Sequence, residues 1–226
     1  NPVTDELPIN TYTTGEQTWP EAASGPDDLA VVIWHSSPQD GDGWGVYGRI
    51  VDANSNMLTD EIPINQNTIT SQWHGDVGAF AGGFGVTWHF NGQGSPIGPS
   101  IWVRVFDWNG NALSNEFRAD TDSYLPRRPS IGLAPDGSSF VAWYSYDQNY
   151  EQQDVFARRF DALYNPLGPV FPVNQYIFSA QGGASVVVDE DGNVTVVWTS
   201  DHQDGSDRGI FGQRYDAAGN PLGHLP

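Results

Sequence analysis

A tryptophan recurs four times along this chain, roughly every 55 residues, and other positions recur in step with it. The tryptophans are Trp34, Trp88, Trp143 and Trp198. An aromatic column (Tyr47, Trp102, Phe156, Phe211) is followed by columns of aspartate (Asp52, Asp107, Asp161, Asp216), asparagine (Asn56, Asn111, Asn165, Asn220) and leucine (Leu58, Leu113, Leu167, Leu222). A Pro-Ile/Val-Asn triplet ends the pattern at 8–10, 63–65 and 172–174, with Arg-Ala-Asp at 118–120 as the deviant copy. A fixed period of this kind indicates four copies of one structural unit.

Each copy is composed of short strands joined by tight turns. In the fourth copy, residues 184–188 and 194–199 are rich in β-branched side chains and flank an Asp-Gly turn, and 210–216 form a third strand. No segment has helical periodicity. Units of this length with three or four antiparallel strands are typical of propeller blades. The sequence therefore predicts an all-β, four-bladed β-propeller; the alternative is a fragment of a longer β-repeat array.

The domain organisation follows from the repeats. One domain is predicted over 1–226, with repeats at 7–61, 62–116, 117–170 and 171–226. The two ends of the chain are candidates for completing one blade together. Burial between blades accounts best for the repeated tryptophans, and turn formation accounts best for the repeated aspartates and asparagines.

Charge and composition restrict the possible partners. The chain has 28 acidic residues and nine basic ones, all arginine, for a net charge of −19. A phosphate backbone would be repelled, so nucleic acid is not an expected partner. No apolar run is long enough to insert in a membrane. Because there is no cysteine, disulfides and thiolate metal sites are excluded. The acidic balance fits calcium or a neutral glycan as partner, or an acidic surface that only serves solubility.

The copies resemble a repeat found in large secreted or surface proteins of bacteria. The fourth copy carries the resemblance in Val197-Trp198, in Gln203-Asp204-Gly205-Ser206 and in the run Gly209–Asp216. The first copy is similar at Gln39–Gly43, whereas the second and third depart from the Gln-Asp-Gly loop. The resemblance implies a secreted or cell-surface setting, although the chain starts without a signal segment, and it implies no particular activity.

Positions that differ between copies are the ones free to serve function. Fifteen residues before each repeated tryptophan stand Trp19, Trp73, Arg128 and Gly183, with Glu21, His74, Asp76 and Arg127 beside them. A tryptophan next to acids and arginines is a surface on which a sugar ring stacks while its hydroxyls form hydrogen bonds. The leading functional prediction is an extracellular carbohydrate-binding or adhesion module; in the competing interpretation these tryptophans pack beneath loops.

A second prediction is a polysaccharide-degrading enzyme, a lyase or a glycoside hydrolase. His35, His89, Tyr144 and Thr199 follow the repeated tryptophans. His89, Tyr144 and Arg128 would serve as base, acid and charge neutraliser if they converge. A third alternative is a structural surface repeat without a ligand. The sequence leaves the oligomeric state open.

Two loops offer closely spaced carboxylates for calcium. They carry Asp40 and Asp42 in the first copy, and Asp204 and Asp207 in the fourth. Calcium prefers hard oxygen ligands of this kind, so these four residues are the predicted metal ligands.

Overall fold

The chain folds into four separate antiparallel sheets. The computed structural model describes residues 6–121, 123–147, 149 and 152–223. Blade 1 contains β1 (Glu16–Ser24), β2 (Ala30–Ser37), β3 (Gly45–Val51) and β4 (Ile62–Pro63). Blade 2 contains β5 (Gln72–Phe80), β6 (Gly83–Phe90), β7 (Ser100–Phe106) and β8 (Phe117–Arg118). Blade 3 contains β9 (Tyr124–Leu133), β10 (Ser139–Tyr146), β11 (Gln153–Phe160) and β12 (Phe171–Pro172). Blade 4 contains β13 (Gln181–Val188), β14 (Val194–Asp201), β15 (Arg208–Tyr215) and β16 (Pro221–Leu222).

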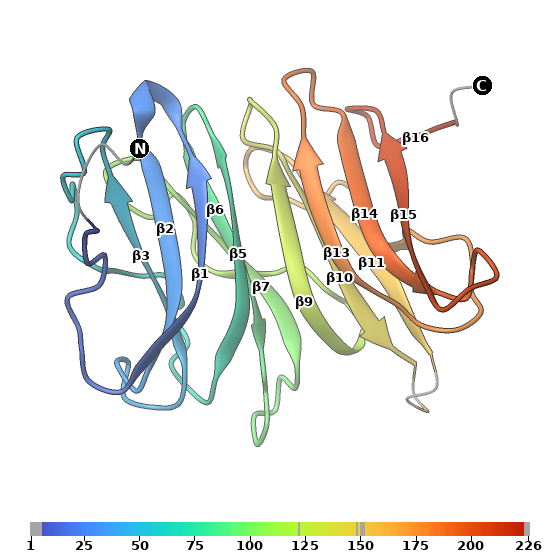
Figure 1. Ribbon diagram of the computed structural model, residues 1–226, viewed down its shortest axis with the longest axis horizontal. Coiled ribbons are helices and arrows are strands. Elements are labelled where there is room, and N and C mark those ends of the chain that lie inside the picture. Colours follow the sequence, from blue (N-terminus) through green and yellow to red (C-terminus); the bar gives the residue numbers. More distant parts are fainter. Residues whose placement is uncertain (1–5, 122, 148, 150–151, 224–226) are drawn as a thin grey trace.

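Within each sheet the strands follow one another in chain order, and consecutive blades pack through their first strands. In Figure 1, β1, β5, β9 and β13 follow one another across the picture, while the outer strands of blades 1 and 4 extend to opposite sides. The prediction of four β-propeller blades is confirmed. Blades 1 and 4 share no packing comparable to that of consecutive blades in the described part of the chain. Each short fourth strand of blades 1 to 3 lies just past the predicted repeat boundary.

Helical structure in the described residues is limited to the 3-10 turn at Pro26–Asp28. None of it could cross a membrane. The repeated aspartates form turns because the side chain accepts hydrogen bonds from its own loop. Asp52 Oδ1 accepts the backbone N–H groups of Asn54 and Asn56, and the bond from the asparagine four residues later recurs in the other three copies.

The four repeated tryptophans are buried, and three of them lie between blades. Each is at most 5% exposed. Three of them lie in clusters that join neighbouring sheets: Trp88 packs with residues of blades 1 and 2, Trp143 with residues of blades 2 and 3, and Trp198 with residues of blades 3 and 4. Trp34 lies outside these clusters and borders a separate cavity with Pro8 and Ile9. Burial of apolar surface between the sheets therefore holds the blades together.

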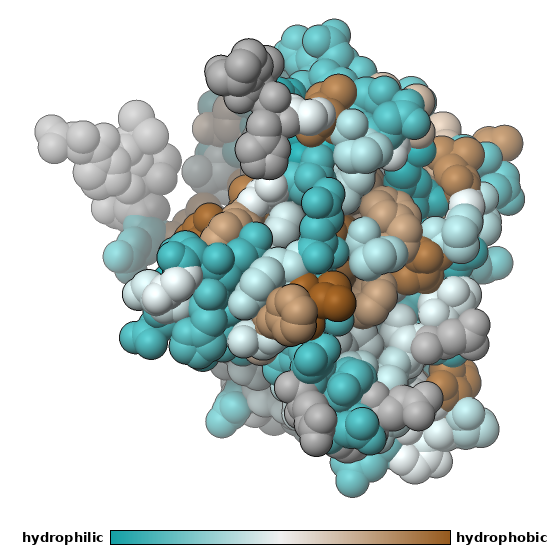
Figure 2. All heavy atoms as spheres, turned by 90° about the vertical axis from the view of Figure 1, so that its right-hand side faces the viewer, coloured by the Kyte–Doolittle hydropathy of each residue, from teal (hydrophilic) through white to brown (hydrophobic). Residues whose placement is uncertain are grey.

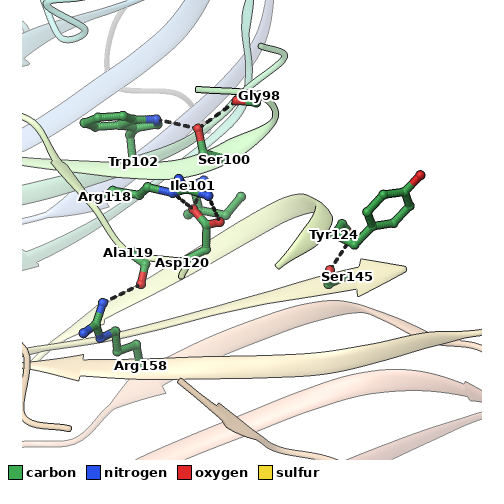
Figure 3. A network of polar contacts seen from close by, with 10 residues as sticks. All are labelled: Gly98, Ser100, Ile101, Trp102, Arg118, Ala119, Asp120, Tyr124, Ser145 and Arg158. Carbon is green, nitrogen blue, oxygen red and sulfur yellow. Dashed lines mark hydrogen bonds and ion pairs between the residues drawn. The ribbon is translucent and has the colours of Figure 1, made fainter. Parts of the chain in front are cut away.

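The deviant triplet at 118–120 keeps the structural role of its counterparts. In blades 1 and 3, a buried asparagine (Asn65 or Asn174) accepts the backbone N–H of the neighbouring strand. In blade 2, Asp120 Oδ1 accepts the N–H of Ile101 at 2.7 Å instead, and Arg118 neutralises the buried carboxylate at 2.7 Å (Figure 3). A carboxylate replaces an amide here because an arginine two residues earlier compensates its charge.

One face of blade 4 is exposed where the other blades are covered. Val46, Ile101 and Val155 are fully buried beside the next blade, whereas Ile210, at the same position of the repeat, is 75% exposed. Val187 and Val197 of blade 4 are also exposed. Figure 2 shows this side of the molecule, with apolar atoms gathered at its centre among hydrophilic ones.

This difference predicts unequal effects of one substitution at two equivalent positions. Ile101→Ala removes buried methyl groups and is expected to lower the free energy of unfolding by about 2–5 kcal/mol. Ile210→Ala is expected to cost less than about 1 kcal/mol, because its side chain already contacts water. Urea unfolding followed by tryptophan fluorescence measures both. Equal losses would show that the face of blade 4 is covered in solution.

Candidate functional site

All four innermost strands break register at the same point, and each break is a β-bulge. The pairing with the second strand shifts between Thr18 and Glu21 in blade 1 and between Trp73 and Asp76 in blade 2. Equivalent shifts occur in blades 3 and 4. A residue in the left-handed region lies at each bulge: Trp19 (φ 50°), His74 (φ 52°), Arg128 (φ 45°) and Gly183 (φ 64°).

Three of these four residues are large, and a large side chain rarely adopts positive φ. Such a conformation costs on the order of 1–3 kcal/mol per residue and persists where the surroundings impose it, commonly at functional sites. Only blade 4 uses glycine, which adopts it without this cost. Because the same strained conformation recurs on three neighbouring blades, the space that these bulges surround is the candidate functional site.

The bulges surround one open cavity on the common side of the four blades, of about 360 Å³. Every blade lines this axial cavity with its bulge residue and with a second residue two positions later. The second set is Glu21, Asp76, Ser130 and Ser185. A β-bulge redirects side chains without ending the strand, so four bulges deliver eight residues to one place.

An aromatic wall borders the axial cavity on the side of blades 1 and 2. Trp19 is 49% exposed, and its ring centroid lies 5.6 Å from those of both Trp44 and His74. The ring of His35 packs against that of Trp19 in a T-shaped arrangement, with the ring centroids 5.4 Å apart. The wall presents an accessible indole supported from behind, which is a surface for a flat or ring-shaped ligand.

Two carboxylates from adjacent blades also face the cavity. Burial raises the pKa of Glu21, and the nearby charge of Asp76 raises it further. Burial also raises the pKa of Asp76, although Asp76 Oδ1 and Oδ2 accept the backbone N–H groups of Val77 and Ile131, both at 2.9 Å. The two acids are therefore electrostatically coupled, and the hydrogen bonds favour ionised Asp76.

Arginines border the cavity on the side of blade 3. Arg128 is exposed and lines both the axial cavity and a second one of about 300 Å³ between blades 3 and 4. The second cavity also includes Tyr144 and an ion pair between Arg208 and Asp201, at 3.1 Å. Neither Arg127 nor Arg128 forms an ion pair with a described residue. Burial lowers the pKa of His74, and Arg128 and Arg127 lower it further.

Of the residues predicted for glycan binding, the structure brings five together in the axial cavity: Trp19, Glu21, His74, Asp76 and Arg128. Arg127 lies next to them but outside the lining. Trp73 is also outside, because the first hairpin of blade 2 is one residue shorter. Trp73 pairs with His89 as Thr18 pairs with His35, so His74 is the counterpart of Trp19.

The predicted catalytic trio is divided. Tyr144 and Arg128 line the second cavity together. His89 is fully buried and lines neither cavity; both ring nitrogens lack a hydrogen-bond partner among the described residues. Burial lowers the pKa of His89 to about 3, so this imidazole is neutral at pH 7. His35 ties two blades together, since its Nε2 accepts the N–H of Gly75 at 3.0 Å.

Sequence reasoning missed Ser130 and Ser185, the counterparts of Glu21 and Asp76. Both serines sit in unremarkable β-strand sequence, and only the repeated bulge identifies them. Pro20 and Pro129 directly follow the bulge residues of blades 1 and 3, a local signal that could have placed these two bulges.

The predicted calcium ligands lie in two separate loops. Asp42 Oδ2 accepts the N–H of Thr70 at 3.1 Å, and Asp204 Oδ1 accepts that of Ser206 at 3.0 Å. Within the described part of the chain, no three acidic or histidine side chains are grouped as a metal site would require. Calcium binding by Asp40, Asp42, Asp204 and Asp207 stays a prediction.

Comparisons with known proteins show which solved structures share this fold. No protein-family model matches the sequence, and neither does the sequence of any curated protein. Solved structures do match. An α-L-arabinofuranosidase from Lactobacillus brevis is 12% identical with a TM-score of 0.53, covering 88% of this chain and 73% of its own. An α-L-arabinanase from Penicillium chrysogenum, complexed with arabinobiose, is 14% identical with a TM-score of 0.57, covering 94% and 67%. A protein of unknown function from Dyadobacter fermentans is 9% identical with a TM-score of 0.62, covering 90% and 66%. At these identities the comparison shows a shared fold.

Proposed function

We propose that the axial cavity binds a glycan and hydrolyses a glycosidic bond. The observation that carries this proposal is the pair of coupled carboxylates, Glu21 and Asp76, next to the exposed indole of Trp19 in one cavity. Glycoside hydrolysis generally requires two carboxyl groups on either side of the bond, one protonated and one ionised. The cavity volume lies within the range of small-molecule sites.

The environments of the two acids suggest their roles. Glu21 accepts no hydrogen bond from a described residue, and the charge of Asp76 favours its protonated form, so Glu21 is assigned as the general acid. Asp76 accepts two backbone N–H groups, which favour its ionised form against the effect of burial on its pKa, and it is assigned as the base or nucleophile. Trp19 would stack on a sugar ring. Two structural neighbours, named as an α-L-arabinofuranosidase and an α-L-arabinanase, add support for carbohydrate as the ligand class.

The test is release of reducing ends from a panel of plant and bacterial polysaccharides, with wild type beside Glu21→Gln. Glu21→Gln is chosen over a change at Asp76 because Asp76 also ties blade 2 to blade 3 through Ile131. The proposal requires turnover by the wild type and its loss in the variant.

A second candidate function is glycan binding without cleavage. It is favoured by the hydrogen bonding of Asp76, since both oxygens are already engaged by backbone N–H groups. Ser130 Oγ, at the equivalent position, accepts the N–H of Val186 at 3.0 Å in the same structural role. Retention of a polysaccharide on an affinity gel, without release of reducing ends, would identify this function.

A further inference from the structure

The charges that line the axial cavity are separated by blade. Glu21 and Asp76 project from blades 1 and 2, and Arg128 projects from blade 3. Blade 4 contributes Gly183, Ala184 and Ser185, which carry no charge. A ligand in the axial cavity would therefore contact acids at one end and a guanidinium at the other.

The Arg128 guanidinium has no polar partner among the described residues. Of the nine arginines, Arg118 and Arg208 form ion pairs, at 2.7 and 3.1 Å, and four others donate hydrogen bonds to backbone carbonyls: Arg49, Arg104, Arg158 and Arg159. Within the described part of the chain, only Arg127, Arg128 and Arg214 do neither. Arg128 forms no ion pair and no side-chain hydrogen bond with a described residue, yet it is held at a strained bulge where both cavities meet.

The space around Arg128 is open. The bulge residue of the next blade is Gly183, and a side chain there would meet nothing within 4 Å. Arg127 adds a second positive charge close by, since both arginines act on His74 and on Tyr144. A planar guanidinium with free N–H donors matches a carboxylate in geometry and charge.

We propose that the ligand of the axial cavity is an acidic glycan whose uronate carboxylate binds Arg128. This inference rests on the proposed function for its carbohydrate part and adds the substrate class. The sugar ring lies against the aromatic wall, and its carboxylate lies toward blade 3, away from Glu21 and Asp76. A neutral sugar would leave the Arg128 guanidinium without a charged partner.

The test measures binding by calorimetry to oligosaccharides of galacturonate, glucuronate and mannuronate, each beside its methyl ester. The ester keeps the sugar and removes the charge. We expect the wild type to bind at least one uronate about ten- to a hundredfold more tightly than its ester, the range for a charge-assisted hydrogen bond. Arg128→Gln is expected to reduce that ratio to about one, because its neutral amide does not distinguish the carboxylate from the ester by charge; Arg128→Lys is expected to retain part of the preference. The matched control is Arg214→Gln, an exposed arginine on β15.

Several outcomes would overturn the inference. Equal affinity for every uronate and its ester would show that the cavity has no carboxylate site. An Arg128→Gln variant that keeps the full preference for uronate over ester would show that Arg128 does not form it. A sulfated neutral oligosaccharide that binds as tightly as the uronates would rule out selection of a carboxylate. The outcome for the proposed function is separate: cleavage of neutral glycans would uphold hydrolysis and reject this inference, whereas uronate binding without cleavage would do the reverse.

Discussion

Glu21→Gln is expected to lower kcat about 10²- to 10⁴-fold on the glycan that the wild type hydrolyses, the usual contribution of a general acid. The amide keeps the size and polarity of the side chain but has no proton to donate to the leaving oxygen. Binding should change little, because Trp19 and Arg128 are untouched. Initial rates of reducing-end release and calorimetric affinity for the same substrate separate the two effects.

The pH profile makes this prediction specific. Glu21 must be protonated to act as an acid, and its pKa is raised, so activity should fall as pH rises through that pKa. In Glu21→Gln the residual activity should lack this basic limb. The control is Glu16→Gln on the same strand, outside the cavity lining, which should keep the wild-type rate and profile. A Glu21→Gln variant with an unchanged rate would assign the acid elsewhere.

Trp143→Ala is expected to lower the free energy of unfolding by about 3–5 kcal/mol, the largest effect on stability that we predict. Trp143 is fully buried and packs with residues of blades 2 and 3, so the truncation leaves a cavity where two sheets meet. In a chain of this size, such a loss corresponds to a Tm lower by about 10 °C. Urea unfolding and thermal melting measure the two quantities.

The matched control for this change is Trp19→Ala. The indole of Trp19 is half exposed, so its removal should cost much less stability than removal of Trp143. Trp19→Ala is expected to weaken glycan binding instead. If the two variants lose equal stability, the repeated tryptophans are not the main connection between blades.

The fold could be read from the sequence because its determinants are local and repeated. Asp161 followed by Asn165 predicts a turn, since the side chain of Asp161 bonds to N–H groups within its own loop. Alternating β-branched runs ending in a tryptophan predict strands with one buried face. Because these signals occur four times in step, errors in one copy, such as the deviant Arg118–Asp120, do not change the architecture.

The candidate site could be predicted only in part from the sequence. Trp19 and Arg128 could be identified because the residue at their position of the repeat differs between copies. Trp73 also stands fifteen residues before a repeated tryptophan, but it does not line the cavity. The shorter first hairpin of blade 2 shifts the register by one residue, and a shift of one residue exchanges the side chains of the two faces. His74 therefore takes the place that counting assigned to Trp73. The separation of His89 from Tyr144 and Arg128 could not be predicted either, because the burial of His89 depends on neighbours far away in the sequence.

By itself, the sequence determined the repeat, the strands, the turns and the burial of the tryptophans, because each depends on side chains within one unit or on a face that every unit shares. Only the tertiary structure decided which side chains meet. Glu21, Asp76 and Arg128 come from three blades, and four bulges turn their neighbours toward one cavity. That convergence depends on how rigid sheets are placed around a common axis, which no single stretch of the chain encodes.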